Sequence, residues 1–400
     1  MSAGCLEMAD YKATATLPPA ANWYSANILA AGPGGWLAWG AKNSLVLLHD
    51  GDEAEAGDTE GGFPRVITHH EATSSERGKV TAVAWCPQPG GAGRDRAQLV
   101  SGAEDGALTS WRLDTERGQL ARCGHTAAGM GRVTSLSWSA ADPGLVLAAG
   151  ETGGSVVTMW DLVTGTASQA TYGKQMVFSV ACHPARADTA ALGCKLGLVL
   201  IVNIEGSGRV LQKMRGHDED VYGVAWSPAS TGLVLGGQEH EGWLVASSSR
   251  DRTVRVWSAA EGRALHTIKL PPGPGQDRRQ QGAGQHSWVT CSWPAPATLL
   301  SSGAGGELLA WQLDKPGRKG QGSEWRVLSR EHARNLFSIA VDSARGRVYT
   351  VAQDRSVVAT SLTGTRLYSL PCFAGFVYAV ASNPIEPSTL AIGAGDGLIR

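Results

Sequence analysis

The chain has 400 residues and a formal net charge of −1 at pH 7, so no global field attracts nucleic acid and no DNA partner is expected. It has no apolar run of about 18 residues, and residues 1–12 lack the features of a secretory signal, so neither a membrane span nor an export signal is predicted. Its seven cysteines are scattered and form no Cys-x-x-Cys pair, which indicates reduced thiols in an intracellular protein.

The first predicted unit follows an N-terminus, residues 1–16, that is expected to be flexible. Residues 36–40 and 44–49 are predicted to form two strands around the turn 41–43, because each run is short and bounded by turn residues. Trp23 and Tyr24 open this unit after a Leu-Pro-Pro sequence. Adjacent aromatic residues at this place either anchor the closure of a ring of repeats or stack on planar ligands, and the residues alone leave both interpretations open.

The clearest unit lies in residues 216–257. Three segments, 221–226, 244–248 and 253–257, have the alternating pattern of short strands, and residues 250–252 form a tight turn between the last two. A Gly-His pair at the start and a tryptophan at the end resemble the WD-repeat signature, in which each repeat is one four-stranded blade of a β-propeller.

In that repeat family, a histidine, a strand serine or threonine, the turn aspartate and the tryptophan form one hydrogen-bonded chain. His217, Asp251 and Trp257 match this set, together with a serine among residues 247–249. The match is informative about the fold and carries almost no information about function.

The same pattern recurs along the chain. First strands are predicted to end at Trp85, Trp138, Cys182, Trp226, Trp293, Val341 and Ser382. Third strands are predicted to end at Trp111, Trp160, Asn203, Trp257, Trp311 and Thr360. We therefore predict an all-β fold, a seven-bladed β-propeller of WD repeats over residues 17–372. Residues 373–400 are expected to be a truncated eighth unit that closes the ring or begins a second propeller, as in a fragment of a longer protein.

Five glycine-rich or charged segments between the strands are predicted to be solvated loops, at residues 50–62, 87–97, 229–242, 271–285 and 315–322. The last two are basic. Their charge either serves solubility or contacts an anionic partner, and the sequence does not choose between these roles.

No motif of an enzyme is present. The chain has no Gly-x-x-x-x-Gly-Lys-Ser/Thr loop, no His-Glu-x-x-His pair and no Gly-x-Ser-x-Gly turn. Most acidic residues fall in tight turns, where carboxylates cap backbone amides. We therefore predict a protein that is not an enzyme, with no catalytic residue, no metal site and no cofactor.

Comparison of equivalent positions in the units points to a binding surface. The residue just before each first strand is expected to face the centre of the ring, and most of these residues are polar. Phe376 is an exception, and an exposed aromatic at this position suggests a contact. The next position is aliphatic except at Trp288, whose indole is too large for a valine-sized slot and is expected to project from it. Tyr378 lies one position further, where Phe178, Tyr222 and Phe337 also occur, and is expected to pack.

Three cations fall in matching turns between second and third strands: Lys42, Arg250 and Arg355. Aromatic residues and cations around one mouth suit single-stranded RNA, because bases stack on rings and phosphates pair with Lys or Arg. A methylated, cationic guanine would stack more strongly still, through cation–π attraction.

Several motifs outside the generic repeat positions are similar to those of the Gemin family, whose RNA-reading WD-repeat subunit belongs to the SMN complex. They lie at residues 17–19, 22–24, 215–218, 268–271, 305–311, 375–378 and 390–400. The resemblance covers essentially the whole chain from Leu17. It implies a first propeller followed by the start of a second one.

The resemblance also implies a function. The family recognises small nuclear RNA by its uridine-rich Sm site and its 7-methylguanosine cap, and delivers it to the SMN complex for assembly of spliceosomal ribonucleoproteins in the cytoplasm and nucleus. By this resemblance Trp23, Tyr24, Lys42 and Arg355 contact the Sm site. Trp288 and Phe376 hold the cap guanine, with Tyr378 close by.

The chain departs from the family and repeat patterns at three positions. Lys42 stands where an arginine is expected, and Asn203 and Thr360 replace the usual tryptophans, so their blades are expected to be degenerate. The competing hypothesis is a protein-interaction scaffold that does not bind RNA, a common use of WD propellers.

Overall fold

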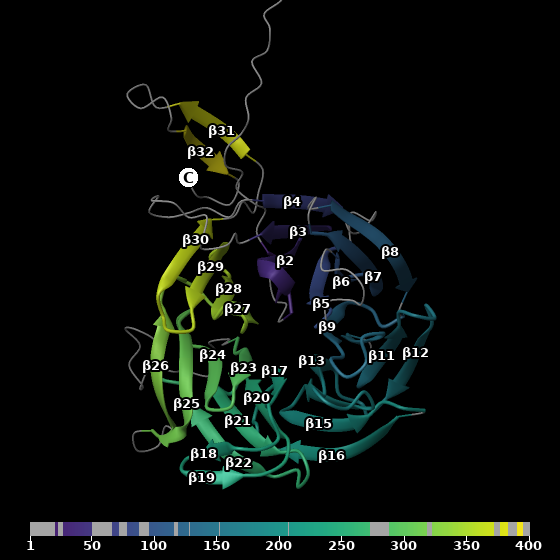
Figure 1. Cartoon of the computed structure of the whole chain (residues 1–400), viewed down its shortest axis with the longest axis vertical. Coiled ribbons are helices and arrows are strands. Elements are labelled where there is room, and N and C mark those ends of the chain that lie inside the picture. Colours follow the sequence, from purple (N-terminus) through teal and green to yellow (C-terminus); the bar gives the residue numbers. More distant parts are fainter. Residues whose placement is uncertain are drawn as a thin grey trace, which may run out of the picture.

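Seven four-stranded antiparallel sheets form a ring in the computed structural model (Figure 1). The structure describes residues 21–22, 27–49, 66–71, 78–87, 96–115, 119–127, 129–151, 153–206, 208–272, 288–317, 322–371, 377–382 and 390–394. Only the backbone is described for residues 66–71, 96, 371, 377–382 and 390–394.

We number the sheets as blades in chain order, and the bounds of their strands are as follows. Blade 1 contains β1 (Leu29–Ala31), β2 (Trp36–Ala41), β3 (Ser44–His49) and β4 (Val66–Glu71), with a short 3₁₀ helix η1 (Pro33–Gly35) after β1. Blade 2 contains β5 (Val80–Trp85), β6 (Arg96–Ala103), β7 (Ala107–Asp114) and β8 (Gln119–Ala127). Blade 3 contains β9 (Val133–Trp138), β10 (Leu145–Gly150), β11 (Val156–Asp161) and β12 (Ala167–Thr171). Blade 4 contains β13 (Val177–Cys182), β14 (Thr189–Cys194), β15 (Leu198–Asn203) and β16 (Arg209–Arg215).

The remaining blades follow the same order from the innermost strand outward. Blade 5 contains β17 (Val221–Trp226), β20 (Leu244–Ser249), β21 (Thr253–Ser258) and β22 (Ala264–Lys269). Blade 6 contains β23 (Cys291–Ala295), β24 (Thr298–Ser302), β25 (Leu308–Pro316) and β26 (Ser323–Ser329). Blade 7 contains β27 (Leu336–Asp342), β28 (Arg347–Ala352), β29 (Ser356–Ser361) and β30 (Arg366–Pro371).

The predicted all-β, seven-bladed propeller is confirmed, and the described residues include no α-helix. Within the described part of the chain, no helix has the length and apolar character needed to cross a membrane. After blade 7, β31 (Val377–Ser382) and β32 (Leu390–Ala394) pair with each other in a separate two-stranded sheet, drawn beside the ring in Figure 1. The predicted boundaries at residues 16–17 and 372–373 lie outside the described residues.

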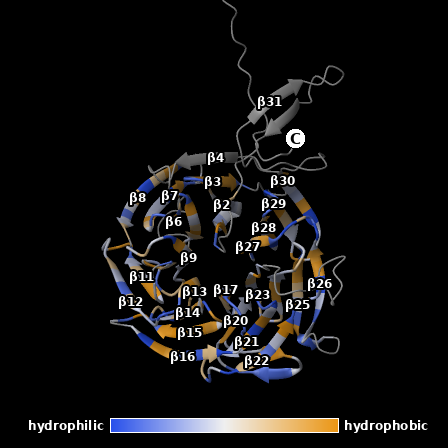
Figure 2. Ribbon diagram, turned by 180° about the vertical axis from the view of Figure 1, so that it is seen from behind, coloured by the Kyte–Doolittle hydropathy of each residue, from blue (hydrophilic) through white to orange (hydrophobic). Residues whose placement is uncertain are grey.

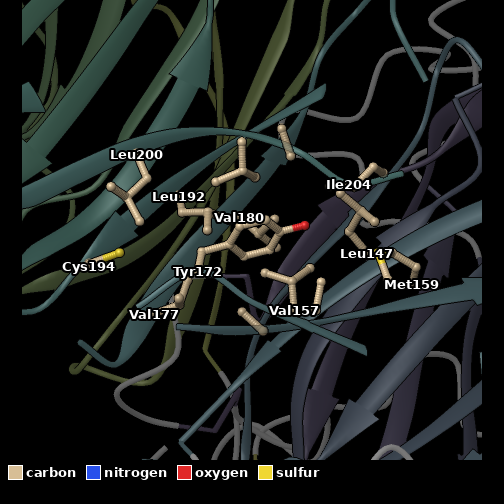
Figure 3. Close-up of a cluster of buried hydrophobic side chains, with 14 of the residues drawn as sticks. Leu147, Val157, Met159, Tyr172, Val177, Val180, Leu192, Cys194, Leu200 and Ile204 are labelled. Carbon is tan, nitrogen blue, oxygen red and sulfur yellow. The ribbon is translucent and has the colours of Figure 1, made fainter. Parts of the chain in front are cut away.

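The core is a series of hydrophobic layers between neighbouring blades. Figure 3 shows the layer between blades 3 and 4, where Leu147 and Val157 of one sheet meet Leu192 and Leu200 of the next, all 0–1% exposed. Figure 2 shows more hydrophobic residues on the strands nearer the ring axis and hydrophilic residues on outermost strands such as β8 and β12. Each sheet therefore buries both faces against its neighbours, and its outer edge meets solvent.

The ring closes between blades 1 and 7 without a shared sheet. β1 pairs only with β2, and β27 pairs only with β28, although β1 and β27 lie side by side. The two blades are joined by a buried cluster that contains Leu37 and Trp39 from blade 1 and Tyr349 and Val351 from blade 7. Among the described residues, the closure thus rests on side-chain packing.

One predicted loop is folded and packed. Residues 229–242 were expected to be a solvated linker, but they contain a hairpin of β18 (Leu233–Leu235) and β19 (Gln238–His240). Leu233 is fully buried in the layer between blades 5 and 6, and the Gly236 amide donates to the Leu313 carbonyl at 2.8 Å. The prediction was wrong because the apolar partner of this segment lies in β25, far along the chain. Residues 315–316, also predicted to be loop, extend β25.

Serine hydroxyls link the innermost strands of successive blades. The Val180 amide donates to Ser135 Oγ at 3.0 Å, and the Val224 amide donates to Ser179 Oγ at 3.2 Å. Ser135 Oγ in turn donates to the side-chain oxygen of Asn27 at 2.5 Å. These bonds satisfy polar groups near the ring axis and hold β9, β13 and β17 at fixed spacing.

Candidate nucleic-acid interface

One face of the ring carries the turns between the second and third strands of the blades, and we call it the turn face. In blades 2, 3, 4, 5 and 7, a backbone hydrogen bond joins this turn to the residue before the innermost strand of the same blade. For example, the Arg250 amide donates to the Asp220 carbonyl, and the Gln353 amide donates to the Asn335 carbonyl, both at 2.9 Å. Among the described residues, those compared by position in these five blades therefore lie on one face.

A row of four aromatic rings runs across the innermost strands of blades 4 to 7. It consists of Phe178, Tyr222, Trp288 and Phe337. The Tyr222 and Trp288 rings stack with centroids 4.3 Å apart and an interplanar angle of 9°. Phe178 meets Tyr222 edge-on at 5.2 Å, and Phe337 meets Trp288 edge-on at 5.8 Å. We call these residues the aromatic row.

Trp288 leaves the buried slot that its counterparts occupy. In blade 5, Val221 is fully buried and the following Tyr222 is partly exposed. In blade 6 the order is reversed, because Val289 is fully buried and the preceding Trp288 is partly exposed. The indole thus projects from the slot and lies beside Tyr222, since only the smaller valine fits the space between sheets.

The Trp288 indole is fixed by polar bonds as well as by stacking. The indole Nε1 donates to the backbone carbonyl of Phe337 at 3.0 Å. The backbone carbonyl of Trp288 accepts a hydrogen bond from Ser302 Oγ at 3.3 Å. The ring therefore bridges blades 6 and 7 at the turn face.

Arg250 lies in the turn after β20, where its backbone amide donates to the Asp220 carbonyl. Burial, and then the nearby Asp220 carboxylate, raise the pKa of Tyr222, while the Arg250 charge acts in the opposite direction. The phenol is therefore neutral at physiological pH.

Lys42 lies in the β2–β3 turn of blade 1, and its backbone is held by Asn22. The Lys42 amide donates to Asn22 Oδ1 at 2.7 Å, and Asn22 Nδ2 donates to the carbonyls of Lys42 and Val80 at 2.8 and 2.7 Å. The Val83 amide donates a hydrogen bond to the backbone carbonyl of Asn27 at 2.8 Å. Trp23 and Tyr24 lie outside the described residues, but Asn22 and Asn27 on either side are anchored to blades 1 and 2.

Arg355 lies in the β28–β29 turn, and its backbone is strained. The φ of Arg355 is 66°, and Arg252 at the matching position of blade 5 has a φ of 65°. Blade 2 has a glycine, Gly106, at this position. A non-glycine residue in this region costs about 1 kcal/mol. All four positive-φ residues other than glycine in the described chain lie in turns of this face: Lys42, Leu196, Arg252 and Arg355.

The polar chain expected in blade 5 is present. His217 Nδ1 lies 2.8 Å from the Asp251 carboxylate, and His217 Nε2 lies 2.7 Å from Ser247 Oγ. Trp257 Nε1 donates to the same hydroxyl at 2.7 Å. Burial alone would raise the pKa of Asp251, but the hydrogen bond and charge of His217, with the bond from Thr253, lower it to about 2.

A second network of this kind was missed by the sequence analysis. In blade 7, His332 Nδ1 lies 3.1 Å from the Asp354 carboxylate and Nε2 lies 2.8 Å from Thr350 Oγ1. Only the tryptophan is absent, because Thr360 stands in its place. The signal that could have revealed this network was the pair His332 and Asp354, which have the same roles as His217 and Asp251.

The structure brings together some of the predicted site residues and leaves others undescribed. Trp288, Arg355 and Lys42 lie on the turn face over the consecutive blades 6, 7 and 1. Phe376 lies outside the described residues, and Tyr378 is described only as a backbone position on β31. Phe178, Tyr222 and Phe337, which occur at the position of Tyr378 in other repeats, form the aromatic row with Trp288.

The described residues offer little for other chemistry. They contain no group of three His, Cys, Asp or Glu side chains placed to hold a metal ion. Burial raises the pKa of Cys182 and Cys194 to about 12, which suppresses the thiolate form. The geometry of the described face is that of a binding surface.

Comparison with known proteins first defines the class. Residues 208–258 match the family model "WD domain, G-beta repeat". In fold, the chain is similar to a chain in the crystal structure of the mitotic checkpoint complex, with a TM-score of 0.62 and 16% identity over 90% of this chain and 96% of that one. The chain is therefore a β-propeller protein in which residues 208–258 match a WD repeat.

The chain is also similar to gem-associated protein 5. It is 28% identical to the mouse protein over 96% of its length and 27% of the relative's, and the human protein gives the same identity and coverage of 96% and 26%. Component of gems protein 5 from Dictyostelium discoideum is 23% identical over 56% of this chain and 22% of that protein. The chain thus spans about a quarter of the length of these relatives. Propeller fold and homology together indicate a non-catalytic scaffold or binding protein.

Proposed function

We propose that this propeller binds small nuclear RNA, through its 7-methylguanosine cap and its uridine-rich Sm site, for delivery to an SMN complex during assembly of spliceosomal ribonucleoproteins. This activity would be exercised in the cytoplasm and nucleus. The single observation that carries the proposal is the aromatic row, in which a partly exposed tryptophan is pre-stacked on the turn face. Similarity to gem-associated protein 5 over nearly the whole chain supports the same proposal.

The chemistry of the turn face fits a methylated base. An indole is the strongest neutral partner for a cationic ring, and N7-methylation places a positive charge on guanine. In the proposed complex, the base stacks on the face of Trp288 opposite Tyr222, with Phe376 and Tyr378 contributed by the segment after blade 7. Unmethylated guanine lacks the charge, and we expect it to bind more weakly.

Uridines of the Sm site are proposed to lie over blades 7 and 1. Trp23 and Tyr24 would stack on the bases, and Lys42 and Arg355 would meet phosphates. The backbones of both cations are held in left-handed turns, with φ of 50° and 66°. With a net charge of −1, stacking is expected to carry specificity and the salt dependence of binding should be shallow.

The first test is titration of the 400-residue chain with a 7-methylguanosine cap analogue, with GTP as the comparison, followed by tryptophan fluorescence. We expect quenching that is specific for the methylated base and absent in Trp288→Leu. Trp325→Leu is the matched control, since this partly buried indole lies on the outermost strand β26. Binding of cap analogue and GTP with equal affinity by the folded chain would refute the cap assignment.

The Sm-site half of the proposal has its own test. A short uridine-rich RNA should bind the wild-type chain and lose affinity in Trp23→Ala and Lys42→Ala. If neither substitution weakens binding, and if pull-downs recover the same proteins with and without RNase, the chain is an RNA-independent protein scaffold.

A further inference from the structure

Tyr222 stands in a position that the proposed function leaves unexplained. Its ring covers one face of Trp288 at 4.3 Å and is nearly parallel to it. Its other ring contact is with Phe178 of blade 4, which it meets edge-on. A side chain held between Phe178 and Trp288 is well placed to control the orientation of the indole.

Trp288 depends on this support more than other tryptophans of the fold. It precedes β23 and is not part of a strand. Trp257 and Trp311, in contrast, are fully buried in third strands and donate to serines of their own sheets. Because Trp288 is partly exposed, its orientation is set by the Phe337 carbonyl on one side and by Tyr222 on the other.

We infer that Tyr222 is a positioning residue that holds Trp288 in its base-stacking orientation. This inference rests on the proposed function, because it assigns the support of the stacking site. The ligand class is an N7-methylated purine nucleotide, which would stack on Trp288 in the proposed complex. Tyr222 acts through Trp288 and does not touch the base.

The physical reason is pre-organisation. An indole that rotates freely before binding loses that freedom when a base stacks on it, and this loss opposes binding. A ring already stacked by Tyr222 has lost the freedom during folding. Removing the tyrosine ring should therefore weaken cap binding about threefold to tenfold, which is the range expected for ordering one large side chain.

The experiment compares Tyr222→Leu with Tyr222→Phe in the 400-residue chain. Leucine removes the ring, whereas phenylalanine keeps the ring and removes only the hydroxyl group. Phe178→Leu is the control for loss of an aromatic residue from the row without direct loss of the Trp288 stack. The ligand probe is 7-methyl-GTP, with GTP beside it, and thermal unfolding shows whether each variant is folded.

A second readout observes Trp288 without any ligand. The chain is labelled with 5-fluorotryptophan, and the Trp288 fluorine resonance is assigned by its loss in Trp288→Phe. Because a stacked ring displaces this resonance through its ring current, Tyr222→Leu should shift and broaden it. Tyr222→Phe should leave the resonance sharp and near its wild-type position. The affinity of this variant for 7-methyl-GTP should stay within about twofold of the wild-type value.

The outcomes separate the inference from the proposed function. A shifted Trp288 resonance with weaker 7-methyl-GTP binding in Tyr222→Leu, restored in Tyr222→Phe, supports the inference. An unmoved resonance overturns it, and so does a shifted resonance with wild-type affinity. If the wild-type chain itself does not prefer 7-methyl-GTP to GTP, the proposed function fails first, and the inference about its support falls with it.

Discussion

Blades 5 and 7 contain the same polar network but differ in how it ends. In both, a buried histidine joins an aspartate of the turn to a hydroxyl of the second strand, Ser247 in blade 5 and Thr350 in blade 7. In blade 5 the Ser247 hydroxyl also accepts a hydrogen bond from the Trp257 indole. Blade 7 has Thr360 in place of this tryptophan. The carboxylate is also better covered in blade 5, where the Asp251 side chain is 7% exposed against 17% for Asp354.

The difference shows that the network has two separable parts. The histidine and aspartate fasten the turn to the segment before the innermost strand, as shown by the Asp218 and Ala333 amides, which donate to the two carboxylates. The tryptophan adds bulk and one hydrogen bond at the middle of the sheet. A blade that loses only the tryptophan therefore keeps its turn in place, and the turn face stays intact over blade 7.

The largest effect is expected from removing the histidines. His217→Ala leaves the buried Asp251 carboxylate and the Ser247 hydroxyl without their partner, and should lower the free energy of unfolding by about 3 kcal/mol. His332→Ala should cost about 2 kcal/mol, because Asp354 is more exposed and water can replace part of the lost bond. Urea unfolding of the two variants measures the difference, and a larger loss for His332→Ala would contradict this account.

Acid should weaken blade 5 through the same pair. The pKa of Asp251 is lowered from 3.8 to about 2 in the folded chain, so its contribution is complete above about pH 4 and is lost as the pH falls through 2. The contribution amounts to about 2 kcal/mol. The difference in unfolding free energy between wild type and Asp251→Asn should therefore shrink between pH 4 and pH 2. A difference that stays constant across this interval would show that the pair does not titrate as described.

The separate contribution of the indole is tested by Trp257→Phe against Trp160→Phe in blade 3. Trp257→Phe loses the bond to Ser247 and some packing, and should cost about 1–2 kcal/mol. Trp160 is also buried, but its Nε1 has no hydrogen-bond partner, since Ala148 lies at the position of the serine that accepts this bond in blades 2, 5 and 6. Trp160→Phe should cost about 1 kcal/mol less. Equal losses, measured by thermal or urea unfolding, would mean that the hydrogen bond contributes nothing.

The smallest effect is expected at the strained arginines. Arg252→Gly and Arg355→Gly both relieve a positive φ and should each change stability by less than about 1 kcal/mol, in the stabilising direction. On the proposed function only Arg355→Gly weakens binding of a uridine-rich RNA, and Arg252→Gly is its matched control. Equal binding by the two variants would remove Arg355 from the proposed RNA surface.

Much of the fold was predictable because its signals are local. Alternating residues and tight turns placed β17, β20 and β21 within one residue of their observed ends, and they placed β2 and β3 in the same way. The hydrogen-bonded set of blade 5 followed from three residues of one repeat. These signals act within a few tens of residues, where the geometry of a blade is already determined.

What the sequence did not reveal depends on contacts between blades. The β18–β19 hairpin was read as a solvated loop, because the strand that buries it belongs to blade 6. The reversal of Trp288 and Val289 could be anticipated from the size of the indole, but its partner Tyr222 could not, since their contact joins different sheets. The network of blade 7 was overlooked because its most conspicuous member, the tryptophan, is missing.

The closure of the ring between blades 1 and 7 has a mechanical consequence. At every other junction the polypeptide itself passes from one blade to the next, but β1 and β27 share neither a connection nor a ladder of backbone bonds. In the described part of the chain, the apolar cluster around Trp39 and Tyr349 resists a pulling force across this junction. We therefore expect the ring to open at this junction first, while the blades themselves remain folded.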